Sequence, residues 1–168
     1  MPRSFDVVTE STATVEQVHA AFRREEYWLD RIEAAGDPNT TLDSLRVDTD
    51  GTVNMHATQH MLRHGLPTLV TKLIPGDLRL VHTETWRPAA EGHLRGRISV
   101  AASPRLGAGH ADGLLTPAGD GSQLRFAVRV EVKIPLLGGK FENSIAAGLT
   151  DSLPELQRFT TTWIAEHT

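Results

Sequence analysis

The feature that most constrains the fold is a change of hydrophobic period at residues 130–142. Before the change, every second residue is apolar, as in a strand with one buried face: Leu124, Phe126, Val128, Val130, Val132 and Ile134. After it, apolar residues recur every three or four positions from Gly139 to about Glu166, which predicts one long helix. The chain therefore passes from a half-buried strand into a helix through one short junction, Val130-Glu-Val-Lys-Ile-Pro-Leu-Leu-Gly-Gly-Lys-Phe-Glu142.

The glycines and lysine of this junction also invite comparison with a phosphate-binding loop. Such a loop requires a glycine at position 134 and a Ser or Thr after Lys140, whereas the sequence has Ile134 and Phe141. In the alternative interpretation, Pro135 ends strand pairing because it has no N–H to donate, and the two glycines let the chain reverse. The junction is therefore predicted to be a hinge between the sheet and the helix.

The remaining chain predicts one helical region and a series of strands. A first strand over residues 2–10 precedes a helical region over 14–36, which starts at a capping box of Thr14 and Gln17. The turn at 48–51 predicts a hairpin of strands 42–47 and 52–61. Further strands are predicted at 78–87, 93–102, 107 to about 116, and 124–134, with turns at 88–92 and 117–121.

Two segments allow more than one structure. Residues 69–74 predict either a short helix or an apolar loop. Pro154 predicts a kink in the last helix, unless Asp151 and Ser152 cap a separate second half. With either outcome, the order is strand, helical region, about six strands and a long helix. This order predicts an α+β helix-grip fold, in which a curved antiparallel sheet of about six or seven strands surrounds the C-terminal helix, as a single domain over residues 1–168.

Composition narrows the functional classes. The 168 residues contain no cysteine, which excludes disulfides, thiolate nucleophiles and cysteine-ligated metals. A net charge of -4 argues against non-specific nucleic-acid binding. The first residues lack the apolar stretch of a secretory signal, and no apolar run reaches the roughly 18–20 residues that span a bilayer. We expect a cytoplasmic protein without a membrane span.

The junction carries a family resemblance. It is similar to the pattern V-x-V-x-I/V-P-x-x-G-G-K/R-x-E of an uncharacterised bacterial family within the START-like superfamily, also called SRPBCC or the polyketide cyclase/dehydrase and lipid transport group. Trp86 in Glu84-Thr-Trp86 and the run Phe159-Thr-Thr-Thr-Trp163 also resemble that family. The resemblance covers essentially the whole chain. It implies a START-like or Bet v 1-like fold with a hydrophobic cavity between sheet and helix, and it transfers no catalytic residue, metal ligand or cofactor.

The leading hypothesis is a module that binds a small hydrophobic or amphipathic ligand such as a lipid, polyketide or isoprenoid. Residues expected to line the ligand site come from the inner face of the sheet and from the last helix: Met55, Glu84, Trp86, Ile98, Phe126, Val128, Val130, Ile145, Leu149 and Leu153. The alternatives are a cyclase- or dehydrase-type enzyme and a regulatory interaction domain with a closed cavity. The enzyme requires Glu84, His82 or Asp112 to point inward. A homodimer is left open.

Other polar residues predict less specific roles. His56, His60 and His64 would stack on a helix, but the surrounding pattern is that of a strand, so a polar surface role is predicted and a metal site is not. Arg95 and Arg97 predict a solvated face in preference to an anion clamp. His110-Ala-Asp112 lacks a serine in a nucleophile elbow, so no catalytic triad is predicted.

Overall fold

The computed structural model describes residues 3–62, 68–73, 77–103, 107–133 and 138–168. Its elements in chain order are β1 (Arg3–Ser11), α1 (Val15–Phe22), α2 (Glu25–Ala34), β2 (Thr40–Val47), β3 (Val53–Met61), α3 (Thr68–Leu73), β4 (Leu78–Pro88), β5 (Leu94–Ser103), β6 (Gly107–Ala118), β7 (Gly121–Val132) and α4 (Gly138–Glu166). A short 3₁₀ turn, Ala90–Gly92, joins β4 to β5. The segment 69–74, which left two structures open, forms the helix α3 within its described part.

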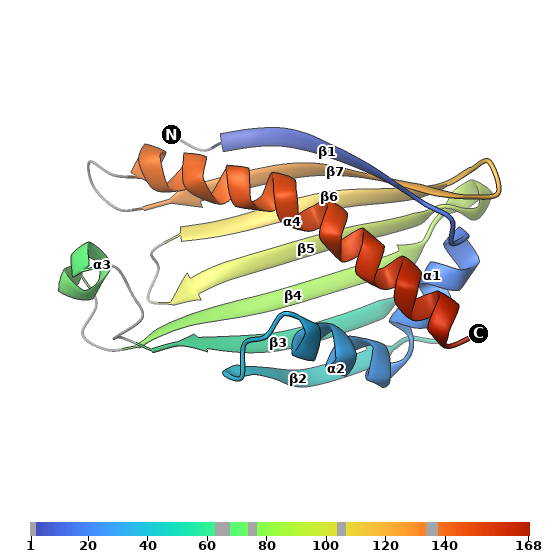
Figure 1. Cartoon of the computed structure of the whole chain (residues 1–168), viewed down its shortest axis with the longest axis horizontal. Helices are drawn as coiled ribbons and strands as arrows, with labels where there is room; N and C mark the ends of the chain where they lie inside the picture. The colour runs from blue at the N-terminus through green and yellow to red at the C-terminus, as the bar shows by residue number, and fades with distance from the viewer. Residues whose placement is uncertain (1–2, 63–67, 74–76, 104–106, 134–137) are drawn as a thin grey trace.

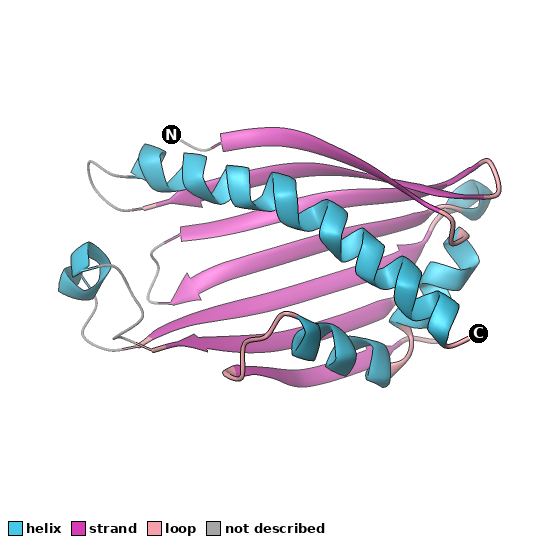
Figure 2. Ribbon diagram, viewed as in Figure 1, coloured by secondary structure: helices cyan, strands magenta, loops and turns pink. Residues whose placement is uncertain are grey.

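The strands form one antiparallel sheet in the order β1-β7-β6-β5-β4-β3-β2. Consecutive strands from β2 to β7 are neighbours, whereas β1 pairs with β7, from Arg3 opposite Val130 to Ser11 opposite Ser122. The helices α1, α2 and α4 lie on one face of the sheet, called here the inner face (Figure 2), and the opposite face is called the outer face. In Figure 1, α4 crosses the inner face obliquely, from the β1–β7 edge toward α1 and α2. The predicted α+β helix-grip fold is thereby confirmed, with seven strands.

The β2–β3 hairpin forms where the sequence predicts it. The Asp48 N–H donates to the Thr52 carbonyl at 2.8 Å, and the Gly51 N–H donates to the Asp48 carbonyl at 3.0 Å. Gly51 has a φ of 90°, a left-handed conformation that favours glycine. The turn residues therefore account for the register of this pair.

The β6–β7 hairpin is tighter than predicted. The strands stay paired to Ala118 opposite Gly121, so the turn comprises only Gly119 and Asp120. Gly119 has a φ of 56°, as a two-residue hairpin turn requires. The predicted turn over 117–121 is too long. Proline is common in turns, but Pro117 lies within the paired strand, opposite Ser122.

The helical region after β1 consists of two helices. The predicted capping box is confirmed: the Gln17 N–H donates to the Thr14 hydroxyl at 3.1 Å, and the Thr14 N–H donates to the Gln17 side chain at 2.9 Å. The helix is interrupted at Arg24, whose backbone is extended. Across this break, the buried Trp28 donates its indole N–H to the Phe22 carbonyl at 2.7 Å, which satisfies an acceptor at the end of α1.

The last helix runs without interruption through Pro154. Asp151 and Ser152 lie inside this helix and do not cap a separate one, while the kink at Pro154 stays a prediction. Its C-terminal half is tied to the rest of the molecule by two polar contacts. The Trp163 indole donates to Asp30 of α2 at 2.8 Å, and the hydroxyls of Ser11 and Thr161 lie 2.6 Å apart.

The described aromatic core is concentrated where α1, α2 and the C-terminal half of α4 meet the sheet. The Phe22 ring lies 5.1 Å from that of Trp86 and 5.3 Å from that of Tyr27, centre to centre. Tyr27 also meets Trp163 edge-on at 5.3 Å. Large buried rings thus fill the inner face at this end, which positions the polar site described next.

Candidate functional site

Trp86 closes the inner face beside α1. Its ring lies over β5 and β6 at two positions without side chains. A Cβ added to Gly96 would lie 2.3 Å from Trp86 Cε3, and one added to Gly113 would lie 2.8 Å from Phe126 Cε1. Trp86 is 2% exposed and Phe126 is also 2% exposed. Gly96 therefore allows the Trp86 ring, and Gly113 allows the Phe126 ring, to pack directly on the backbone of the sheet.

Glu84, the next inward residue on β4, forms a buried ion pair with α2. Arg31 Nη2 donates to Glu84 Oε2 at 2.7 Å, and Arg31 Nη1 donates to Glu84 Oε1 at 3.3 Å. The Trp86 indole N–H donates to the same Oε1 at 3.0 Å. The side chains of Arg31 and Glu84 are 17% and 5% exposed. This geometry fixes the carboxylate from two sides and attaches α2 to the sheet.

The charges of this cluster follow from its surroundings. Burial alone would lower the pKa of Arg31, but the Glu84 carboxylate and the Tyr27 hydroxyl raise it, and the pKa lies above its usual value. Burial raises the pKa of Tyr27. The Tyr27 and Thr160 hydroxyls lie 2.7 Å apart, and the Thr160 hydroxyl donates to the Leu156 carbonyl. Tyr27 is therefore the neutral donor to Thr160, and Arg31 stays charged beside Glu84.

A second polar chain begins at His82, which lies two residues before Glu84 on β4 and on the same face. His82 Nε2 lies 3.1 Å from Gln59 Oε1 on β3, and Gln59 Nε2 donates to Asp37 Oδ2 at 2.6 Å. The Asn39 N–H donates to the other oxygen of Asp37 at 2.8 Å. Backbone donation by Asn39 and side-chain donation by Gln59 lower the pKa of Asp37. Burial lowers the pKa of His82, against the opposing effect of Glu84.

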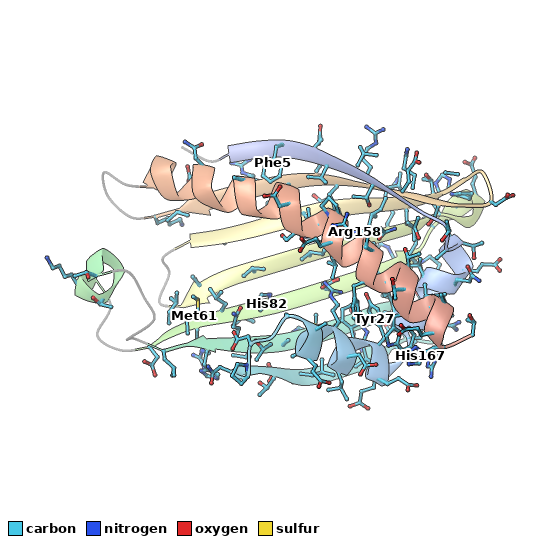
Figure 3. The ribbon with its side chains drawn as sticks, in the orientation of Figure 1. Phe5, Tyr27, Met61, His82, Arg158 and His167 are labelled. Carbon is cyan, nitrogen blue, oxygen red and sulfur yellow. The ribbon has the colours of Figure 1, made fainter. Side chains whose placement is uncertain are left out.

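The inner face around His82 is less filled than the end beneath Trp86. In this half of β6 the inward residues are small: Gly107, Gly109, Ala111 and Gly113. A Cβ added to Gly109 would meet only ordinary contacts, the nearest at 3.5 Å. Several inward residues here are only partly buried, namely Met61, Leu80, His82, Ile98, Val100 and Ala102. In Figure 3, His82 lies between Met61, near one end of the sheet, and Tyr27, toward the other.

The structure separates the residues expected to line a ligand site into groups. Most are buried on the inner face or on the facing side of α4: Met55, Glu84, Trp86, Phe126, Val128, Val130 and Leu153. Ile98 is partly buried next to Glu84 across the β4–β5 pair. The side chains of Ile145 and Leu149 lie outside the described part of the structure. The register brings Glu84, Ile98 and Val128 into one row across the sheet, and His82, Val100 and Val130 into the next.

Other candidate residues lie on the outer face. Asp112 is exposed and 3.6 Å from Arg97, so of the three residues weighed for catalysis only Glu84 and His82 point inward. His56 and His60 are exposed on β3, as predicted, while His64 lies outside the described residues. Arg97 is solvated, as is Arg95; both line an outer groove of about 450 Å³. Among the residues that the structure describes, no group of three His, Asp or Glu could hold a metal ion.

Sequence reasoning missed the partners that define the site. Arg31 and Asp37 belong to or follow α2, and Gln59 lies on β3, so each meets β4 only through the tertiary fold. The one available signal was the position of Arg31. It is a charged residue next to Ile32, which belongs to the apolar stripe of the helical region, so it lies close to the buried side of the helix. Glu142 ends the junction motif, which by itself predicts no contact for this residue. The residue is 1% exposed, and its carboxylate accepts the Val132 N–H at 2.9 Å, which holds the start of α4 against the end of β7.

Comparisons with known proteins agree with this architecture. A family model described as "Protein of unknown function (DUF2505)" matches residues 6–164. Uncharacterised proteins of Mycobacterium tuberculosis (strain ATCC 25618 / H37Rv) and Mycobacterium bovis (strain ATCC BAA-935 / AF2122/97) are each 38% identical over 173 residues, covering 99% of this chain and 99% of the relative.

Solved structures are similar in fold at low identity. A START superfamily protein from Mycobacterium smegmatis has a TM-score of 0.53 and 14% identity, covering 98% of this chain and 99% of the other. Truncated norcoclaurine synthase from Thalictrum flavum has a TM-score of 0.51 and 14% identity, covering 100% and 96%. The protein TTHA0849 from Thermus thermophilus has a TM-score of 0.57 and 12% identity, covering 99% of each chain. None of the helices in the described part of the chain combines the length and the hydropathy of a membrane-spanning segment.

Proposed function

The chain belongs to the DUF2505 family and has the START-like fold, and from that premise we propose that it binds a small hydrophobic or amphipathic ligand. The ligand would lie between the inner face of the sheet and α4, over the row of His82, Val100 and Gly109. Burial of its apolar surface would supply most of the affinity, at roughly 25 cal/mol per Å².

One observation carries this proposal: the inner face is sealed at one end and left partly exposed at the other. Beneath α1 and α2, rings and aliphatic side chains bury it almost completely, as the 1% exposure of Leu94 and of Leu115 illustrates. On β4, β5 and β6 around His82 the inward residues are small or partly exposed, although they lie on the face that carries the helices. A folded chain gains stability by covering apolar surface, so the partly exposed apolar residues there favour an occupant other than the chain itself.

The neighbouring polar groups would orient such a ligand. Glu84 already accepts hydrogen bonds from Arg31 and Trp86, so it would line the site without contacting a polar group of the ligand. Ile98, Val130, Ile145 and Leu149 stay proposed as lining residues, with Trp86 and Phe126 as the closed floor of the site. Small ligand sites commonly combine an apolar lining with a few placed polar groups.

A cyclase- or dehydrase-type enzyme is the second candidate, and His82 is the observation that favours it. Burial lowers its pKa, so the imidazole is neutral near pH 7 and could accept a proton from a bound substrate. One neighbour of similar fold is named as a synthase. Of the three residues weighed as an inward-pointing acid or base, His82 alone fits, because Glu84 is held in an ion pair and Asp112 faces outward.

Native mass spectrometry of the purified protein, before and after organic extraction, tests the proposal. We expect adducts of apolar molecules that disappear on extraction and return when a lipid panel is added. A protein that carries no adduct and takes up none of the panel would contradict ligand binding. Turnover of a bound ligand that is lost in His82→Gln would instead favour the enzyme.

A further inference from the structure

The chain of Asp37, Gln59 and His82 determines which hydrogen-bonding atom the inner face offers. An ionised carboxylate only accepts hydrogen bonds, and two donors lower the pKa of Asp37, so it is ionised near neutral pH. Gln59 must therefore turn its NH₂ toward Asp37, where the N–O distance is 2.6 Å. The opposite orientation would place the amide oxygen against the carboxylate. The orientation of this amide is thus set by its partner.

With the amide oriented in this way, its oxygen faces His82. Gln59 Oε1 can only accept, and it lies 3.1 Å from His82 Nε2. The imidazole must therefore carry its proton on Nε2 when it is neutral. That leaves Nδ1 with a lone pair, and among the described residues no group donates to it.

His82 is placed where a ligand could reach it. It is partly exposed on the inner face, opposite Ala57 on β3 and Val100 on β5. Neither neighbour has a polar side chain. The charged groups around it are Glu84 on the same strand, Arg31 on α2 and, through Gln59, Asp37. Glu84 and Arg31 are paired with each other, so within the described part of this cluster His82 Nδ1 is the acceptor that a ligand could use.

From this arrangement we propose that the ligand carries a hydrogen-bond donor, such as a hydroxyl group on an otherwise apolar molecule, and that His82 Nδ1 accepts from it. The inference rests on the proposed function and narrows its ligand class. An alcohol fits because its O–H pairs with the lone pair. A methyl ether of the same chain length does not, since two acceptors would face each other. Gln59 acts as a positioning residue that holds His82 in the required tautomer.

The tautomer can be tested without any ligand by ¹⁵N NMR of the histidine side chains at pH 7.5. The protein has eight histidines, and the resonances lost in His82→Phe identify those of His82. We expect the Nε2–H form in the wild type and a shift toward a mixture of tautomers in Gln59→Met, because the acceptor for Nε2–H is then removed. A predominant Nδ1–H form in the wild type would overturn the proposal.

Ligand selectivity is tested by calorimetric titration with 1-decanol and with methyl decyl ether. We expect decanol to bind about fivefold more tightly, as one net hydrogen bond allows. The preference should disappear in His82→Phe and persist in the control His56→Phe, which alters an exposed histidine on the outer face. Equal binding of the two compounds by the wild type would overturn the donor requirement while leaving ligand binding intact. Binding of neither compound would count against the proposed function, and against this inference with it.

Discussion

Arg31 on α2 donates two hydrogen bonds to Glu84 on β4, and this pair connects the helical layer to the centre of the sheet. The two residues are 53 positions apart in the chain. The same carboxylate accepts the indole N–H of Trp86, so contacts from a helix and from the aromatic core fix its position on the strand. The ion pair therefore defines the boundary between the packed end of the inner face and the partly exposed end.

We expect Arg31→Met to lower the free energy of unfolding by about 3–5 kcal/mol, because it leaves the buried Glu84 carboxylate without its cation. The double variant with Glu84→Gln should recover part of this loss. Urea unfolding monitored by circular dichroism measures both. The matched control is Arg46→Met, which breaks an exposed pair with Asp48 and should cost less than about 1 kcal/mol. Equal losses in the two single variants would contradict the structural role of the buried pair.

Gly96→Ala should destabilise the protein by about 2–3 kcal/mol, since the new methyl group would lie 2.3 Å from the Trp86 ring. Gly109→Ala serves as the control, because the same methyl group there meets only ordinary contacts. Thermal unfolding distinguishes the two. A Gly96→Ala protein as stable as the control would mean that Trp86 does not lie on β5 as described.

Stability should fall as the pH falls below the unfolded histidine pKa of 6.5, and His82 should contribute to that fall. Burial lowers the pKa of His82 in the folded state, so between that lowered value and 6.5 the unfolded chain binds more protons than the folded one. In His82→Gln this contribution is absent. The difference in unfolding free energy between wild type and variant, measured in urea at pH 7.5 and pH 5.5, should therefore change with pH. An unchanged difference would contradict the burial of His82.

Glu142→Ala should loosen the junction between β7 and α4, because the Val132 N–H then loses its acceptor. We expect a cost of about 1–3 kcal/mol. Hydrogen exchange resolved at the Val132 amide provides a local readout, which should quicken more than exchange at Val128 in the middle of the strand. Unchanged exchange at Val132 would show that the carboxylate does not hold the strand end.

The alternation of apolar residues was enough to predict which side chains of β7 face inward. Phe126, Val128 and Val130 are each buried, and the residues between them are not. The change from period 2 to period 3.6 also predicted that a strand is followed by a long helix, as β7 and α4 confirm, while Pro135 of the predicted hinge lies outside the described residues. Glu142, the last residue of the junction, has a structural role, because its carboxylate accepts the N–H of Val132.

The polar site could not be read in the same way. The sequence indicates Glu84 and His82 as candidates for inward-pointing polar residues, but their partners depend on how α2 and β3 meet β4. Gly96 and Gly113 carried a usable signal, since glycine within a strand often marks a close approach, yet only the structure identifies Trp86 as the group that approaches. The break between α1 and α2 was also not predicted. It occurs where the Trp28 indole donates to the Phe22 carbonyl, a contact that the apolar pattern does not indicate.

The most direct test of the central claim is ligand uptake by Gly109→Leu, measured by native mass spectrometry after organic extraction and exposure to a lipid panel. A leucine at this inward position would add a large side chain between Val100 and Val130, its neighbours in the register, where the Cβ itself meets only ordinary contacts. The control is Ala101→Leu, which adds a comparable side chain to the outer face of β5. Loss of uptake in Gly109→Leu, with uptake retained in the wild type and in Ala101→Leu, is the predicted result. Uptake that is unchanged in Gly109→Leu, in a variant as stable as the wild type, would contradict a ligand site on the inner face.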